Sequence, residues 1–382
     1  MHPARSLLEL AAALRTRGRL HYEAARPAPP PGDERQVPDL ADVRGQETAK
    51  RAVEVAAAGA HGLLFIGPPG AGKSMLAQRV PGLLPPLTDA EAIETATIHS
   101  VSRDSPPFER WHERPFRAPH HSASAAAVVG GGARPLPGEA SLAHHGVLFL
   151  DELPEFNRAV LESLREPLET GAVSIARARY RVTYPARFQL VAAMNPCPCG
   201  HAGDESGRCR CTPAQVQRYL AKLSGPLIDR IDLHVPVRAV DYARLREAAP
   251  GTGGTSQAAA RVSRARERQC ARGGLNAVLP LPEIEAACGL GDREHELLGS
   301  AAARLGLSAR ACHRALRVAR TIADLDGAGR VGPGQLAEAL GYRCLDRLGG
   351  GPGTGPAVPW GIRCPAGEGG LDGRAQRTWS SM

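Results

Sequence analysis

The sequence predicts an α/β fold, in which a parallel sheet is flanked by helices, followed by a small all-helical domain. Continuous apolar runs of strand length alternate with helical patterns and glycine turns, which is typical of a parallel sheet with crossover helices. Beyond residue 256, alanine, leucine and arginine recur at helical spacing instead. The clearest buried strands are GLLFIG, GVLFLDE and FQLVAAMN.

Changes in composition divide the chain into five segments. We expect a short helix and a proline-rich linker in residues 1–37, the α/β domain in 38–245, a second linker in 246–256, the helical domain in 257–347, and a glycine-rich tail in 348–382. In the helical domain, one apolar face is formed by Leu305, Ala309, Cys312, Leu316 and Ala319. The tail lacks a periodic apolar pattern, so we expect it to be disordered.

Composition excludes several classes of protein. Of 382 residues, 43% are hydrophobic and 23% charged, as in globular proteins, and no run of 18 apolar residues occurs, which excludes a membrane-spanning helix. Glu9 interrupts the first amphipathic stretch, so a secretory signal is excluded and a cytoplasmic location is expected. A transit peptide fits that stretch less well than an ordinary short helix. The net charge of +8 is compatible with a polyanionic partner.

A phosphate-binding motif follows the first predicted strand. It consists of Gly67, Pro68, Pro69, Gly70, Ala71, Gly72, Lys73 and Ser74, and a helical pattern begins directly after it. The glycines allow backbone N–H groups to point into a nest the size of a phosphate, and the helix N-terminus adds a favourable dipole. We expect Lys73 to reach the β- and γ-phosphates of ATP and Ser74 to ligate Mg²⁺. Only three lysines occur in the chain, and Lys73 is one of them.

Polar side chains end the next two predicted strands. Asp151 and Glu152 follow the run VLFL, and Asn195 ends FQLVAAMN. Because the carboxyl ends of parallel strands share one edge of a sheet, these side chains are expected beside the phosphate loop. We expect Asp151 to hold Mg²⁺, Glu152 to polarise the attacking water, and Asn195 to position that water near the γ-phosphate.

With these residues identified, the chain resembles an AAA+ ATPase and, more narrowly, the magnesium-chelatase-like ComM/YifB family. The matching segments run from about residue 38 to 342 and include PDLADVRGQ, GPPGAGKS, FRAPHHSAS, GEASLAHHGVLFLDELPEF, AAMNPCPCG, SGPLIDRIDLHV and LSARACHRALRVAR. The resemblance implies an ATP-driven ring, usually hexameric, that acts on branched DNA as a branch-migration helicase in natural transformation. It also implies that the helical domain is an AAA+ lid.

The resemblance assigns two kinds of arginine. Arg230 matches the arginine finger that one subunit supplies to the site of its neighbour, where its planar fork would stabilise charge on the transferring phosphoryl group. An ion pair with Asp229 or Asp232 is the alternative. The lid arginine that senses the γ-phosphate would be Arg310, and Arg314, one helical turn away, remains a competitor.

Two features depart from the family. Full-length members begin with a Lon-protease-like domain, of which residues 1–37 would represent only the last piece, and the tail shows no family pattern. A truncated or mispredicted reading frame would explain both ends. Such a chain could be a remnant that binds nucleotide without turnover.

Two basic segments are candidates for loops that face DNA in the central channel. Residues 103–121 interleave arginines, Arg117 among them, with aromatic residues, a mixture that suits single strands. Residues 173–181 alternate as a strand, half of a hairpin, that would place Arg177, Arg179 and Arg181 on one face. For each segment, a solvated charged surface is the alternative.

Four of the nine cysteines are clustered. Cys197, Cys199, Cys209 and Cys211 could complete a tetrahedral zinc site, with His201 able to replace one of them. Redox chemistry and plain reduced thiols are the alternatives, since the C-x-C spacing is tighter than the usual C-x₂-C. The absence of an export signal argues against a disulfide framework.

The sequence therefore favours an ATP-hydrolysing, ring-forming DNA motor with ATP and Mg²⁺ as cofactors. A magnesium-chelatase-type subunit that remodels a partner protein is the second hypothesis, and the inactive remnant is the third.

Overall fold

The computed structural model describes residues 38–102, 110–132, 135–177, 180–203, 207–239 and 254–343, with the single residues 15 and 345. The helix expected near the N-terminus and the tail 348–382 lie outside the described residues. None of the described helices has the length and apolar character needed to cross a membrane.

Five parallel strands form the central sheet. The three predicted strands are its middle, as β1 (Leu63–Ile66), β5 (Val147–Leu150) and β8 (Gln189–Met194), and every residue in them is buried. β2 (Phe116–Arg117) and β9 (Leu233–Pro236) complete the order β2-β5-β8-β1-β9. Successive side chains point to opposite faces, so Leu63 and Phe65 enter one core and Leu64 and Ile66 the other.

Helices cover both faces of the sheet. On one face, η1 (Leu40–Asp42), α2 (Glu47–Gly59) and α3 (Lys73–Leu83) lie between the strands and the C-terminal helical region. On the other side are α5 (Ala125–Val129), α6 (Glu139–Leu142), η3 (Leu153–Glu155), α7 (Arg158–Ser163), α8 (Arg165–Thr170), α9 (Pro213–Leu220) and α10 (Gly225–Ile228). α4 (Asp89–Ser100) begins at a capping box between Thr88 and Glu91.

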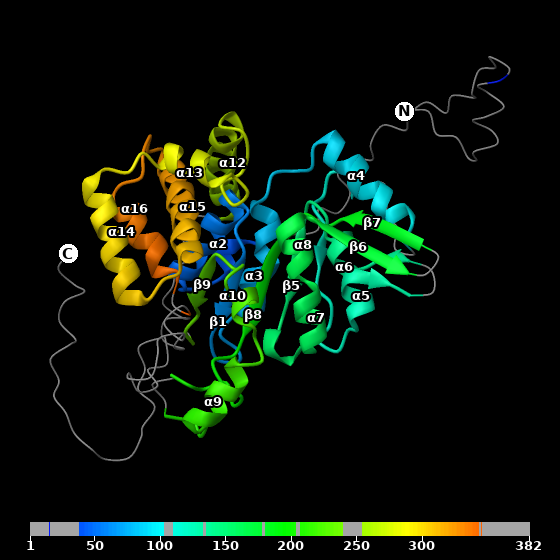
Figure 1. Cartoon of the computed structure of the whole chain (residues 1–382), viewed down its shortest axis with the longest axis horizontal. Coiled ribbons are helices and arrows are strands. Elements are labelled where there is room, and N and C mark those ends of the chain that lie inside the picture. Colours follow the sequence, from blue (N-terminus) through cyan, green and yellow to red (C-terminus); the bar gives the residue numbers. More distant parts are fainter. Residues whose placement is uncertain are drawn as a thin grey trace.

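The C-terminal part is all helical, as predicted. It comprises α12 (Thr255–Ala271), α13 (Leu281–Cys288), α14 (Asp292–Leu305), α15 (Ala309–Asp326) and α16 (Pro333–Gly341), which lie together at one side of the sheet (Figure 1). A buried ion pair, Arg320 to Asp324 at 2.7 Å, lies inside it. Asp324 also accepts a hydrogen bond from Asn276 at 2.9 Å, so these buried polar groups are satisfied. The predicted fold class, α/β followed by helices, is confirmed.

Two antiparallel hairpins project beside the sheet, β3 (Gly130–Gly131) with β4 (Leu136–Pro137) and β6 (Ala172–Arg177) with β7 (Tyr180–Pro185). The second corrects a prediction. The chain turns after Arg177, so Arg177 lies opposite Tyr180 and Ala176 opposite Arg181. Directly opposite residues share a face and neighbours along a strand do not, so Arg177 and Arg181 lie on opposite faces of the hairpin. The prediction that a single strand presents these arginines on one face is therefore wrong for Arg177 and Arg181. Arg179 and the side chain of Arg177 lie outside the described residues.

Candidate active site

The loop between β1 and α3 is shaped for an anion. Gly67 packs so tightly that a Cβ there would lie 2.1 Å from the carbonyl oxygen of Val237. Gly70 and Gly72 adopt left-handed φ angles of 77° and 91°, which side chains rarely tolerate, and a Cβ on either would meet no atom within 4 Å. The loop is therefore fixed on its inner side and open on its outer side, at the N-terminus of α3, as phosphate binding requires.

Lys73 lies at the centre of this loop. Its Nζ donates hydrogen bonds to the carbonyl oxygens of Gly67 at 2.7 Å and Pro68 at 2.8 Å, and to Oδ1 of Asn195 at 3.0 Å. Burial lowers the pKa of Lys73, and the carboxylates of Asp151 and Glu152 oppose that effect. The amine is thus a buried cation held by neutral oxygens at the floor of the loop, where an anion would compensate its charge.

Ser74 and Asp151 form an oxygen-ligand pair. The hydroxyl of Ser74, at the start of α3, donates to Oδ2 of Asp151 at 2.6 Å, one residue after β5 ends. Hydroxyl and carboxylate oxygens are hard ligands of the kind Mg²⁺ prefers. The two residues predicted to hold Mg²⁺ are therefore together, and their donor set fits that ion.

Glu152 follows Asp151 directly and has an exposed carboxylate. It has a left-handed backbone, φ 53°, uncommon for a residue with a side chain, and its side chain is 53% exposed. Its Oε2 lies 3.0 Å from Nδ1 of His121. The sequence analysis did not identify His121 as a partner, because it did not recognise the two-residue strand β2. Placing β2 beside β5 would have predicted His120 and His121 at the same edge as Glu152.

Asn195 follows β8 directly and reaches Lys73, as given above. The structure therefore brings the phosphate loop, Ser74, Asp151, Glu152 and Asn195 to one edge of the sheet. These residues come from three adjacent strands, β5, β8 and β1, whose carboxyl ends meet there.

Arg230 and Arg310 lie at the opposite edge. Arg230 precedes β9, and Leu233 at the start of β9 pairs in parallel with Leu63 at the start of β1. The phosphate loop begins only after β1 ends, about 13 Å further along the sheet at roughly 3.3 Å per residue. Arg230 and Arg310 both line a cavity of about 290 Å³ with Glu169, Asp229, His313, Arg314 and Arg317. They are close to each other and distant from the phosphate loop of the same chain.

Arg230 and Arg314 both have acidic partners within the chain. Arg230 pairs with Glu169, which lines the same cavity, and also donates to the carbonyl oxygen of Pro226, so its acidic partner among the described residues is Glu169 rather than Asp229 or Asp232. Arg314 pairs with Asp232 at 2.6 Å. Burial would raise the pKa of Asp232, but the hydrogen bond from His61 and the charge of Arg314 hold it well below its usual range. Arg310 is exposed at the cavity mouth.

Comparison with known proteins identifies this arrangement. Residues 39–245 match the family described as magnesium chelatase, subunit ChlI, and residues 253–343 match the C-terminal part of that subunit. The chain belongs to this AAA+ ATPase family. It is 53% identical over 311 residues to competence protein ComM of Haemophilus influenzae and 51% identical over 311 residues to YifB of Escherichia coli. Each alignment covers 81% of this chain and 61% of the relative.

A more distant relative carries the family's name. The magnesium-chelatase 67 kDa subunit of Heliobacterium mobile is 27% identical over 229 residues, covering 51% of this chain and 30% of the relative. The magnesium-chelatase-like family and its ComM/YifB branch, predicted from the sequence, are thereby confirmed. The chain spans about three-fifths of the length of ComM and YifB.

The basic residues expected to face DNA differ in their surroundings in this ChlI-family chain. Arg117 forms a bidentate ion pair with Glu139, in which Nε of the arginine lies 2.6 Å from Oε2 of the glutamate and Nη2 lies 2.9 Å from Oε1. Because this bidentate ion pair offsets much of the positive charge of Arg117, the guanidinium would bind a phosphate less strongly. Arg181 is exposed on β7. Of residues 103–121, the part 103–109 lies outside the described residues.

The four clustered cysteines of the ChlI-family chain come together after β8. The Sγ atoms of all four lie within 4.8 Å of one another, and the separations include 3.3 Å for Cys197–Cys199, 3.7 Å for Cys199–Cys209 and 3.9 Å for Cys197–Cys209. Four thiolates at about 2.3 Å from a zinc ion would be about 3.8 Å apart at the edges of a tetrahedron. The donor set therefore fits a tetrahedral metal ion.

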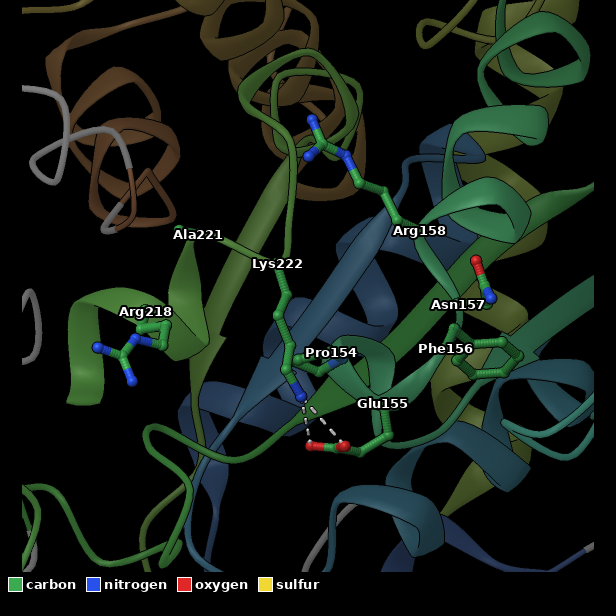
Figure 2. A pocket seen from close by; sticks show the side chains of 8 residues that line it. All are labelled: Pro154, Glu155, Phe156, Asn157, Arg158, Arg218, Ala221 and Lys222. Atoms are coloured by element: carbon green, nitrogen blue, oxygen red, sulfur yellow. Dashed lines mark hydrogen bonds and ion pairs between the residues drawn. The ribbon is translucent and has the colours of Figure 1, made fainter.

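A groove of about 460 Å³ lies between η3 and α9 (Figure 2). Lys222 crosses it to pair with Glu155 at 3.2 Å, and its ammonium lies 5.4 Å from the ring centroid of Tyr219. Arg158 and Arg218 line the groove from its two sides. Its charged lining residues are the three basic residues Arg158, Arg218 and Lys222 and the acidic residue Glu155.

Proposed function

We propose that this chain hydrolyses ATP at the edge of the sheet that carries Lys73. The observation that carries the proposal is the convergence of Lys73, the Ser74–Asp151 pair and Asn195 on one open glycine loop. The loop amides and Lys73 would bind the phosphates. A bound Mg²⁺ would neutralise charge on the phosphate oxygens, held by Ser74 and Asp151.

Water activation is the role that we propose for Glu152. Its exposed carboxylate can accept a proton from a water molecule, and His121 holds that carboxylate in position. Asn195 lies on the Lys73 side of the loop and would orient the water toward the terminal phosphate. The three polar groups after β5 and β8 would then have separate tasks: metal ligand, base and orienting amide.

Arg230 and Arg310 would complete the site of a neighbouring subunit. Both lie at the sheet edge opposite their own phosphate loop, and both line one cavity. In a closed ring, the amino edge of one subunit can face the carboxyl edge of the next, which is a heterologous interface. We therefore propose a homo-oligomeric ring, hexameric by resemblance to its family, in which Arg230 acts in trans and Arg310 senses the same phosphate.

Branched DNA is the substrate that we propose for the motor, which would make the chain a branch-migration helicase acting in the cytoplasm. Support comes from the similarity to a competence protein and from the net charge of +8. The β6–β7 hairpin, whose strands carry Arg177 and Arg181, is the segment that we assign to the DNA backbone, together with Arg179, which lies outside the described residues. Arg117 has a weaker case, because Glu139 already holds it.

Zinc is the metal that we propose for the four cysteines. The thiolate set and the sulfur separations near a tetrahedral edge support it, and the site would be structural, since all four positions are filled by protein ligands.

The proposal is tested by measuring ATP turnover with and without a four-way DNA junction at low and moderate salt. Stimulation that fades with salt is the expected result, because binding to phosphates releases counterions. Charge reversal at Arg181 (Arg181→Glu) should abolish stimulation and leave basal turnover unchanged. Turnover indifferent to DNA would move the substrate to a protein, as for a chelatase-type subunit. Nucleotide binding without turnover would identify an inactive remnant.

A further inference from the structure

The segment that carries the cysteines is packed directly against the nucleotide site. We call residues 196–203 and 207–212 the cysteine loop; it begins one residue after Asn195. Gly200 of this loop has a left-handed φ of 81°. A Cβ added there would lie 2.6 Å from Cδ of Pro69 in the phosphate loop and 3.8 Å from Cγ of Asn195. Because the two loops are in close contact at this point, a shift of one loop must displace the other.

A second contact joins the cysteine loop to Asn195 through α9. Burial raises the pKa of Tyr219, and the backbone of Asn195 lies close enough to its hydroxyl to act against that shift. Tyr219 and Val216 are the buried residues of α9, and Val216 packs with Cys197 and Ala202 in a small separate cluster. The backbone N–H of Ala202 also donates to Sγ of Cys197 at 3.2 Å. Asn195 is thus held from both sides by elements that meet at the cysteines.

The described part of the cysteine loop has only a small hydrophobic core. Its own core consists of three buried residues, Cys197, Ala202 and Val216, separate from the two large cores on the faces of the sheet. Such a small cluster buries too little apolar surface to fix a loop of this length. Small loop-rich regions of this kind are commonly stabilised by a structural metal ion, whose binding energy then serves as folding energy.

We propose that metal binding by Cys197, Cys199, Cys209 and Cys211 clamps the phosphate loop and Asn195 in their working positions, so that ATP turnover depends on the metal. The route runs from the metal through the Gly200 turn to Pro69 and Asn195, and from Asn195 to Lys73 at 3.0 Å. The inference rests on the proposed zinc site and on the proposed ATP hydrolysis. The cysteines are positioning residues, since they would act on the phosphate loop through the Gly200 turn.

Two variants separate the metal from the contact that transmits its effect. Cys209→Ser with Cys211→Ser removes two ligands, and Gly200→Ala keeps all four but pushes a methyl group against Pro69. We expect about one zinc ion per chain in the wild type and in Gly200→Ala, and almost none in the double variant. Both variants should lose about tenfold or more in kcat, because misplacement of about 1 Å can cost a hundredfold. Cys270→Ser, an exposed cysteine of α12, is the matched control and should change neither quantity.

Removing and restoring the metal on wild-type protein guards against a variant that fails to fold. The protein is stripped with a chelator, dialysed, and assayed in excess Mg²⁺ before and after zinc is added back, while circular dichroism reports the fold. Binding of a fluorescent ATP analogue is measured in parallel. Loss of turnover and weaker nucleotide binding, both restored by zinc, would support the clamp.

Three results would overturn it, each at a different step. If the chain neither retains zinc after purification nor binds added zinc, the proposed metal site is wrong. If the metal-free chain stays folded and keeps its turnover and its nucleotide affinity, the clamp is contradicted and the metal has a structural role only. If zinc-loaded protein shows no ATP turnover, the proposed function is wrong. In that case the clamp is tested by nucleotide binding alone, and an affinity for the ATP analogue that is unchanged after removal of the metal would contradict it as well.

Discussion

Replacing Glu152 by glutamine should separate nucleotide binding from hydrolysis. Glutamine keeps the size of the side chain and an oxygen that can accept from His121, which lies 3.0 Å away. It loses the ability to take a proton from water. General-base catalysis contributes about 10²–10⁴ in rate, equivalent to about 3–5 kcal/mol of transition-state stabilisation. We therefore expect kcat to fall by at least about a hundredfold.

Nucleotide affinity should change little in the same variant. Ser74 pairs with Asp151, and Lys73 donates to Gly67, Pro68 and Asn195, so none of these bonds involves Glu152. Glu152 acts on Lys73 only through its charge, and exposed charges interact weakly, so the dissociation constant should stay within about threefold.

Glu155→Gln is the matched control, assayed beside Glu152→Gln by phosphate release and by titration with a fluorescent ATP analogue. Glu155 lies three residues further along, at the end of η3, and pairs with Lys222 on the surface. Its loss should leave kcat within about twofold, as expected for an exposed ion pair. A Glu152→Gln variant that hydrolyses ATP as fast as this control would remove Glu152 from the role of base.

Four further predictions follow from the site and the sheet edges. His121→Ala should lower kcat with little change in KM, while His121→Asn should recover part of the loss; equal effects of the two in a steady-state assay would show that holding Glu152 is unimportant. Ser74→Ala should raise the Mg²⁺ concentration needed for half-maximal turnover, and an unchanged Mg²⁺ titration would contradict its role as a ligand. Mixing Arg230→Ala with Lys73→Ala should restore turnover that neither has alone, because mixed rings contain interfaces with an intact Lys73 facing an intact Arg230; no recovery in any mixing ratio would argue against action in trans. Burial lowers the pKa of His234 from its ordinary 6.5 to about 3. Below pH 6.5 only the unfolded chain therefore binds a proton at this histidine, and its contribution to the free energy of unfolding should fall by about 1.4 kcal/mol for each unit by which the pH is lowered. A melting temperature that rises as the pH is lowered from 6.5 to 5 would contradict this.

The sequence was sufficient where one element determines both the fold and the site. The strands β1, β5 and β8 are buried on both faces, so each is a continuous apolar run. The polar residue that ends such a run must lie at the carboxyl edge. Asp151 and Asn195 could therefore be placed beside Lys73 before any coordinates were known.

Short elements and distant partners could not be predicted in this way. β2 has only two residues, Phe116 and Arg117, and a strand of that length shows no periodicity in the sequence. Because β2 was not among the predicted strands, the contact of His121 with Glu152 could not be predicted. The β6–β7 turn follows a run of alternating residues that looks like one strand. The alternation persists on both sides of the turn, so the pattern alone does not show where the chain reverses.

The arginines of α15 show the limit set by tertiary contacts. Arg310 and Arg314 are one helical turn apart and equivalent by sequence. Only the structure shows that Arg314 is paired with Asp232, which precedes β9, while Arg310 lies exposed at the cavity mouth beside Arg230. The contact of Gly200 with Pro69 could not be predicted from the sequence either, because it joins two loops that are distant in the chain and follow the adjacent strands β8 and β1.

The central claim is that ring neighbours complete an ATP-hydrolysing site built on Lys73. Its most direct test is Mg²⁺-dependent phosphate release measured over a wide range of protein concentration, with Lys73→Ala as the baseline. We predict that turnover per chain rises with concentration to a plateau as subunits assemble. Phosphate release no greater than that of Lys73→Ala at every concentration would contradict the claim.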